Sequence, residues 1–228
     1  METITIHHVT KHFQDGDFVV RAVNGIDIAL ESGEFSALAG PSGSGKTTLL
    51  NLIGGLDRPT EGEVFIGGIS MSERTDNELT EIRLRKIGFV FQAYNLIPVL
   101  TAYENVQFVL QIQGVPEKEH RDRITPILKE LGIDGLEDRF PTQLSGGQQQ
   151  RVAVARAVVG NPAIVLADEP TANLDSETSK NLLDLMRRLN EDKGVTFLFS
   201  THDPMVIERA RRVIRLRDGK VQADERKN

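Results

Sequence analysis

The stretch GPSGSGKT, residues 40–47, carries the residue types that bind phosphate. It fits the spacing G-x-x-x-x-G-K-[ST] and lies between an expected strand at 35–40 and an expected helix at 46–56. Glycines let several backbone N–H groups face one phosphate, Lys46 supplies a positive charge, and the Thr47 hydroxyl can hold Mg²⁺. We therefore predict a nucleotide phosphate site made by Gly40, Pro41, Ser42, Gly43, Ser44, Gly45, Lys46, Thr47 and Thr48.

A second group of candidate catalytic residues follows the apolar run IVLADEP, residues 164–170. In parallel sheets, ligands bind at the carboxyl ends of the strands. Asp168 is predicted there as a Mg²⁺ partner through water, and Glu169 is predicted to orient or deprotonate a water aimed at the γ-phosphate. Asp-Glu-Pro by itself more often marks a loop or helix start, but its place after an apolar strand and downstream of a phosphate loop favours catalysis.

Two further side chains end expected strands. Gln92, at the end of GFVFQ, is predicted to reach Mg²⁺ or the attacking water with its amide, and His202, after LFST, to hydrogen-bond the γ-phosphate. Taken alone, either residue is usually only a loop or capping residue.

The stretch LSGGQQQR, residues 144–151, offers a second start of a helix to an anion. Ser145 and Gln148 have capping-box spacing. That explains helix initiation but not Gly146 and Gly147, since each glycine costs roughly 0.5–1 kcal/mol in a helix relative to alanine. We expect another group to approach this backbone closely. Two phosphate-seeking helix ends imply either two ligands or one ligand held from two chains, as in a two-fold dimer.

The net charge, the lack of cysteine and the lack of long apolar runs exclude several classes of function. The 228 residues carry a net charge of −6 and no cysteine, so no overall basic field attracts nucleic acid and disulfides are excluded. The first residues lack a signal-peptide pattern, and no run reaches the ~18 apolar residues of a membrane helix. We expect a chain that stays inside the cell and reaches a membrane only through a partner.

The expected elements give an α/β fold. Strands that alternate with helices predict a parallel sheet covered on both faces. Alternating apolar residues at 26, 28 and 30 predict an antiparallel part near the N-terminus, with turns at Asp15-Gly16, Asn24-Gly25 and Ser32-Gly33. A closing hairpin is predicted to turn at Asp218-Gly219.

The middle of the chain is expected to be helical. Capping-box spacing at Thr75/Glu78 and at Thr101/Glu104 predicts two helix starts. Pro126 is predicted to kink or break a later helix.

Taken in order, GPSGSGKT, FVFQ, LSGGQ, LADEP, Leu174-Asp175 and His202 resemble the motifs of ATP-binding cassette ATPases over nearly the whole chain. The resemblance implies a P-loop NTPase core at 1–92 and 158–228, including an antiparallel β subdomain, with an inserted helical subdomain at 93–157. It also implies a homodimer around two ATPs, in which Ser145, Gly146, Gly147 and Gln148 contact the nucleotide held by the other copy.

The same resemblance assigns two further roles. Asp175 would communicate between the two sites. Phe13 would stack on adenine where tyrosine is more usual, with Phe18 as the alternative.

Longer stretches, such as QLSGGQQQRVAVARA and LADEPTANLDS, are similar to ATPases of lipoprotein-releasing and macrolide-exporting systems. That implies an integral membrane permease partner, driven through a groove near residues 92–103, and a peripheral location on the cytoplasmic face of the cell membrane. ATPases of polar amino-acid importers are the alternative. A soluble cassette ATPase acting on DNA or ribosomes, and a non-hydrolysing scaffold, fit less well.

Overall fold

The computed structural model describes residues 2–16 and 18–227. Within these residues, the strands form two sheets, with the orders β2-β1-β4-β5 and β10-β9-β3-β8-β7-β6. The strands are β1 (Glu2–Asp15), β2 (Phe18–Glu31), β3 (Phe35–Ala39), β4 (Glu61–Ile66), β5 (Ile69–Ser70), β6 (Ile87–Val90), β7 (Ile164–Asp168), β8 (Phe197–Thr201), β9 (Arg212–Arg217) and β10 (Lys220–Arg226). The helices are α1 (Lys46–Ile53), α2 (Asp76–Lys86), α3 (Ala102–Ile112), α4 (Glu117–Glu130), α5 (Gly146–Val158), α6 (Ser176–Lys193), α7 (Pro204–Arg209) and the 3-10 helix η1 (Pro141–Gln143).

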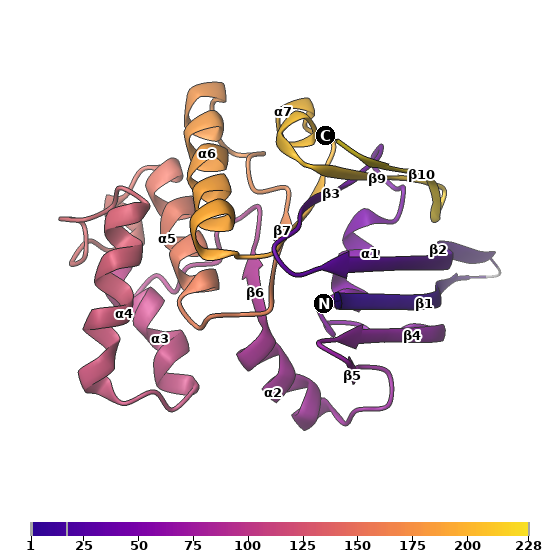
Figure 1. Ribbon diagram of the computed structural model, residues 1–228, viewed down its shortest axis with the longest axis horizontal. Helices are drawn as coiled ribbons and strands as arrows, with labels where there is room; N and C mark the ends of the chain where they lie inside the picture. The colour runs from indigo at the N-terminus through magenta and orange to yellow at the C-terminus, as the bar shows by residue number, and fades with distance from the viewer. Residues whose placement is uncertain (1, 17, 228) are drawn as a thin grey trace.

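The larger sheet confirms the predicted α/β fold. Strands β9, β3, β8, β7 and β6 run parallel, and β10 closes the edge as an antiparallel hairpin (Figure 1). The hairpin turn lies at Asp218 and Gly219, whose φ angles of 51° and 73° suit a primed turn. Because the inner strands are parallel, β3, β7 and β8 end at one edge, where the candidate catalytic residues follow.

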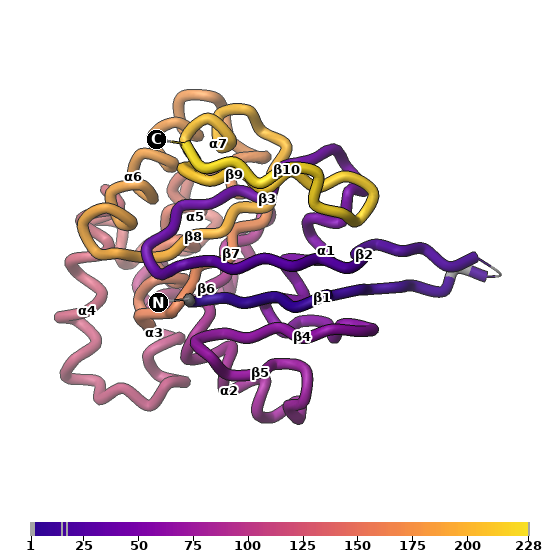
Figure 2. The backbone as a smooth tube through the Cα atoms, turned by 45° about the vertical axis from the view of Figure 1, so that its right-hand side comes forward, coloured from indigo at the N-terminus to yellow at the C-terminus, as the bar shows by residue number. Residues whose placement is uncertain are grey.

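The smaller sheet is antiparallel, as predicted, and β1 and β2 extend as a long hairpin (Figure 2). The turn predicted at Asn24-Gly25 is wrong, because both residues lie inside β2. Between the pairs Val9↔Ile26 and Lys11↔Val23, β2 gains one residue over β1, so Gly25, with φ 67°, lies in a β-bulge. Local composition marks such an irregularity, but pairing with β1 decides its type.

The helix starts follow their local signals more closely. Thr75 and Thr101 both form complete capping boxes with the glutamate three residues later, as predicted. Pro126 was predicted to kink or break its helix, and the break is wrong, because α4 continues through it. Its neighbours Ile124 and Leu128 are fully buried in the core, and this packing offsets the hydrogen bond that proline cannot make.

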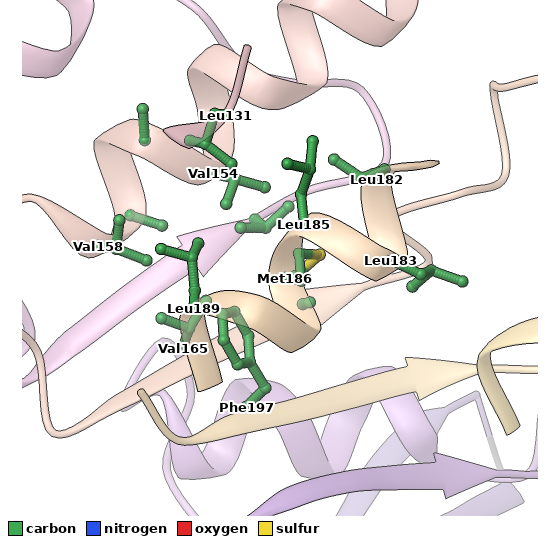
Figure 3. Packing of buried hydrophobic residues seen from close by; sticks show 14 of the residues in the cluster. Leu131, Val154, Val158, Val165, Leu182, Leu183, Leu185, Met186, Leu189 and Phe197 are labelled. Carbon is green, nitrogen blue, oxygen red and sulfur yellow. The ribbon is translucent and has the colours of Figure 1, made fainter. Parts of the chain in front are cut away.

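Two hydrophobic cores lie on opposite faces of the larger sheet. Leu38, Leu166 and Leu198 face α1 and the antiparallel sheet. Their neighbours in the same strands face α3 to α6, and Figure 3 shows Val165 and Phe197 against residues of α5 and α6 such as Val154 and Met186. Consequently α1 and α5 lie on opposite sides of one sheet, as Figure 1 also shows.

Candidate functional site

The loop between β3 and α1 is shaped by glycines that admit no side chain. A Cβ at Gly40 would lie 2.3 Å from the Leu216 carbonyl oxygen, and a Cβ at Gly45 would lie 2.2 Å from that of Ala22. Gly45 also has φ 98°, a conformation that favours glycine. The close approach of β2 and β9 therefore holds the loop in a tight curl at the start of α1.

This curl brings together polar groups that could contact an anion. Lys46 is buried, and its Nζ donates to the carbonyl oxygens of Gly40 and Pro41 at 2.8 and 2.9 Å. The buried Ser44 hydroxyl has no partner among the described residues, and no side chain caps the start of α1. A helix start without a cap, a free hydroxyl and an ammonium group fit the phosphates of a nucleotide.

The predicted metal ligands Thr47 and Asp168 meet across the strand ends. The Thr47 hydroxyl donates to Asp168 Oδ1 at 3.2 Å. The described residues hold no group of three His, Cys, Asp or Glu side chains that would bind a metal by themselves. Two oxygen ligands suit Mg²⁺, which normally takes its remaining ligands from phosphate oxygens and water. The residues present therefore fit a magnesium–nucleotide complex.

Glu169 and His202 form a hydrogen-bonded pair beside this point. His202 Nδ1 lies 2.7 Å from Glu169 Oε1, and the Thr201 hydroxyl donates to Glu169 Oε2 at 3.1 Å. Glu169 adopts φ 45°, which is uncommon for a residue other than glycine and is typical of functional positions. Thr201 was missed in the sequence, although a hydroxyl residue directly before His202 at a strand end was the available signal.

The hollow next to this pair has a volume of about 480 Å³ and is lined by residues of the loops after β7 and β8, including Glu169, Leu174, His202 and Asp203. Gln92 is exposed on the neighbouring loop after β6. Its main-chain carbonyl accepts a hydrogen bond from Asn173 at 2.9 Å, but among the described residues its side-chain amide bonds neither Thr47 nor Asp168. The structure thus brings Thr47, Asp168, Glu169 and His202 to one edge, while no hydrogen bond among the described residues joins the Gln92 amide to them.

The Ser145 segment begins α5 with the expected capping box, in which Ser145 and Gln148 exchange hydrogen bonds. The two glycines have a packing role that the sequence did not reveal. A Cβ at Gly146 would lie 2.8 Å from the Tyr94 hydroxyl oxygen, and a Cβ at Gly147 would lie 2.4 Å from Thr178 Cγ2. Groups of the same chain therefore already approach this backbone.

Two other predicted residues are placed as follows. Asp175 caps α6, and hydrogen bonds from the backbone and hydroxyl of Thr178 lower the pKa of its carboxyl group. Phe13 is 43% exposed on β1, with Lys11 Nζ 5.1 Å from its ring centroid, whereas Phe18 is 78% exposed. Lys11 Nζ thus lies within cation–π range of the Phe13 ring.

The chain is similar to known proteins in both sequence and structure. The family model described as ABC transporter matches residues 23–172. An uncharacterized ABC transporter ATP-binding protein of Methanocaldococcus jannaschii, MJ0796, is 47% identical over 98% of this chain and 97% of its own length. Its solved dimeric post-hydrolysis structure, bound to ADP and Pi, has a TM-score of 0.90 and 45% identity and covers 99% of both chains.

Two kinds of transporter component are also similar. The ATP-binding protein LolD of the lipoprotein-releasing system of Anaeromyxobacter dehalogenans is 44% identical, over 97% of this chain and 93% of its own. The macrolide export ATP-binding/permease protein MacB of Syntrophobacter fumaroxidans is 45% identical over 98% of this chain, which spans 32% of MacB. Within residues 2–16 and 18–227, no helix is long and apolar enough to cross a bilayer.

Proposed function

The chain belongs to the ABC transporter family and is an ATP-hydrolysing, Mg²⁺-dependent subunit of a transporter; from this premise we propose which residues act and how. The observation that carries the proposal is the contact of Thr47 with Asp168 directly beside Glu169. It joins a phosphate loop, a metal position and a carboxylate at one sheet edge.

The phosphate groups of ATP bind where Lys46, the Ser44 hydroxyl and the first N–H groups of α1 converge. Mg²⁺ held by Thr47 and Asp168 would neutralise charge on the transferred phosphoryl group. Glu169 accepts the proton of the attacking water, while Thr201 and His202 orient its carboxylate. His202 is assigned to the γ-phosphate, and the Gln92 amide is assigned to Mg²⁺ or to the attacking water.

Two copies of the chain close around two ATP molecules, with Ser145, Gly146, Gly147 and Gln148 of one copy over the nucleotide of the other. The packing of α1 and α5 on opposite faces of the sheet is compatible with this sharing. Hydrolysis removes the bridging phosphate and loosens the dimer. Asp175, at the start of α6 next to this segment, communicates between the sites, and Phe13 stacks on adenine. The division into a core at 1–92 and 158–228 and a helical insert at 93–157 stays a prediction.

A groove beside the Gln92 loop is our candidate for the membrane partner. It has a volume of about 400 Å³ and is lined mainly by apolar groups of α2, β6, α3, α5 and the segments after α1 and β6, including Leu56, Phe89, Phe91 and Val109. An amphipathic helix of a permease fits such a groove. The subunit would then lie on the cytoplasmic face of the cell membrane, in a system of lipoprotein-releasing or macrolide-exporting type rather than an amino-acid importer.

The test uses Glu169→Gln, with Glu61→Gln on the exposed face of β4 as the matched control. We expect Glu169→Gln to bind ATP, to lose nearly all hydrolysis and to accumulate dimers in size-exclusion chromatography with ATP and Mg²⁺. The control should behave as the wild type. Hydrolysis at the normal rate would remove Glu169 from its role.

Sharing between copies is tested by mixing Lys46→Ala with Ser145→Arg. One intact composite site should form in each heterodimer, so the mixture should hydrolyse ATP faster than either variant alone. A mixture no more active than its components would count against the shared site. Co-purification with membranes then separates a transporter subunit from a soluble cassette ATPase.

A further inference from the structure

Gln150 is a fully buried polar residue one turn into α5 whose amide group bridges two separate loops. Its Nε2 donates to the Pro170 carbonyl oxygen at 2.8 Å and, more weakly, to that of Phe91 at 3.4 Å. Pro170 directly follows Glu169, and Phe91 directly precedes Gln92. One side chain of α5 therefore forms hydrogen bonds with the main chain of both loops that carry the proposed hydrolytic residues.

This bridge uses both hydrogens of a neutral amide group. The neutral amide nitrogen has two hydrogens, one for each carbonyl oxygen, whereas a carboxyl or apolar side chain of similar size offers at most one. The Oε1 atom is buried and has no partner among the described residues. A buried acceptor left without a partner is unfavourable, so the two hydrogen bonds of the amide nitrogen are the polar contacts that hold this side chain in place.

A second contact joins the same two loops from the surface. Asn173, which is exposed, donates from Nδ2 to the Gln92 carbonyl oxygen at 2.9 Å. The loop after β6 is thus hydrogen bonded to α5 through the Phe91 carbonyl and to the segment after Glu169 through the Gln92 carbonyl.

We propose that Gln150 and Asn173 are positioning residues that make the start of α5, the Gln92 loop and the Glu169 loop move as one unit. When α5 of this copy settles on the nucleotide of its partner, the displacement reaches its own Gln92 and Glu169 through these hydrogen bonds. This inference rests on the proposed function and adds to it a route by which closure at one site sets the geometry of the other.

The test compares Gln150→Met with Gln149→Met. Gln149 is the matched control because its Nε2 donates only within its own helix start, to the Leu144 carbonyl oxygen at 3.1 Å. We expect Gln150→Met to lower kcat by about tenfold or more while the KM for ATP changes less than about twofold, because misplaced catalytic groups cost turnover rather than binding. In the Glu169→Gln background it should still dimerise with ATP.

The outcomes separate the two claims. If Glu169→Gln stalls as expected but Gln150→Met turns over like Gln149→Met, this inference is overturned and the proposed function stands. If Glu169→Gln itself keeps hydrolysing ATP, the proposed function fails first. Should Gln150→Met not fold in thermal unfolding, the exposed Asn173→Ala replaces it, with an expected loss of kcat of about threefold at unchanged KM. A wild-type kcat in Asn173→Ala would equally overturn the inference.

Discussion

Gly147 offers a way to separate internal packing from contact with a nucleotide. In Gly147→Ala the new Cβ would lie 2.4 Å from Thr178 Cγ2, whereas ordinary contacts begin at 3.4 Å, so either α5 and α6 move apart by about 1 Å or Thr178 leaves the rotamer that its hydrogen bond to Asp175 holds. Overpacking of this kind costs about 1–3 kcal/mol, and alanine returns about 0.5–1 kcal/mol of helix preference. We expect a net loss of about 1–2 kcal/mol in the free energy of unfolding.

The companion change Thr178→Ser removes Cγ2 but keeps the hydroxyl that donates to Asp175 at 2.7 Å. For a chain of this size the loss in Gly147→Ala corresponds to a decrease in Tm of about 2–8 °C by circular dichroism. The double variant should melt within about 2 °C of Thr178→Ser alone, because the clash is gone. An unchanged Tm in Gly147→Ala would refute the packing argument.

ATPase activity of the double variant then tests the nucleotide contact. If the backbone of Gly147 approaches the nucleotide of the other copy, the methyl group stays in the way after stability is restored. The rate should remain below that of Thr178→Ser by about tenfold or more. Full activity in the double variant would show that Gly147 serves packing only.

Three further predictions follow from other parts of the molecule. Arg212 is almost fully buried between Glu34 and Asp224, so Arg212→Met should destabilise the fold by about 3 kcal/mol in urea unfolding. Capping hydrogen bonds lower the pKa of Glu78 from 4.5 to about 2, so its stabilising effect is full above its ordinary pKa and is lost as the pH falls toward 2. The difference in unfolding free energy between wild type and Glu78→Gln should therefore narrow between about pH 5 and about pH 2. Phe13→Ala should raise the Kd for ATP about tenfold and Phe18→Ala should leave it unchanged, because adenine is assigned to the ring of Phe13; the reverse result would move the adenine to Phe18.

The sequence predicts what short-range chemistry decides. Thr75, Thr101 and Ser145 begin helices because each hydroxyl satisfies an N–H group three residues later, and this spacing is visible in the letters. The phosphate loop is equally local, since its glycines, Lys46 and Thr47 lie within eight residues.

Long-range packing decides the features that the sequence did not reveal. Pro126 stays in α4 because buried neighbours outweigh one missing hydrogen bond, and Gly25 lies in a bulge because β1 sets its register. The contacts of Thr201 with Glu169 and of Thr178 with Gly147 join residues about thirty apart, so no local pattern indicates them.

If Ser145 to Gln148 of one copy complete the site of the other, as proposed, turnover depends on encounters between copies. We then expect the rate per polypeptide to fall on dilution, even with saturating nucleotide, because a lone copy lacks the contact that α5 of a second copy would make. Anchoring two copies to one membrane assembly would replace that search in solution by a high effective concentration. A copy that is not bound to such an assembly would then hydrolyse little ATP, so no separate inhibitor is needed to prevent hydrolysis without transport.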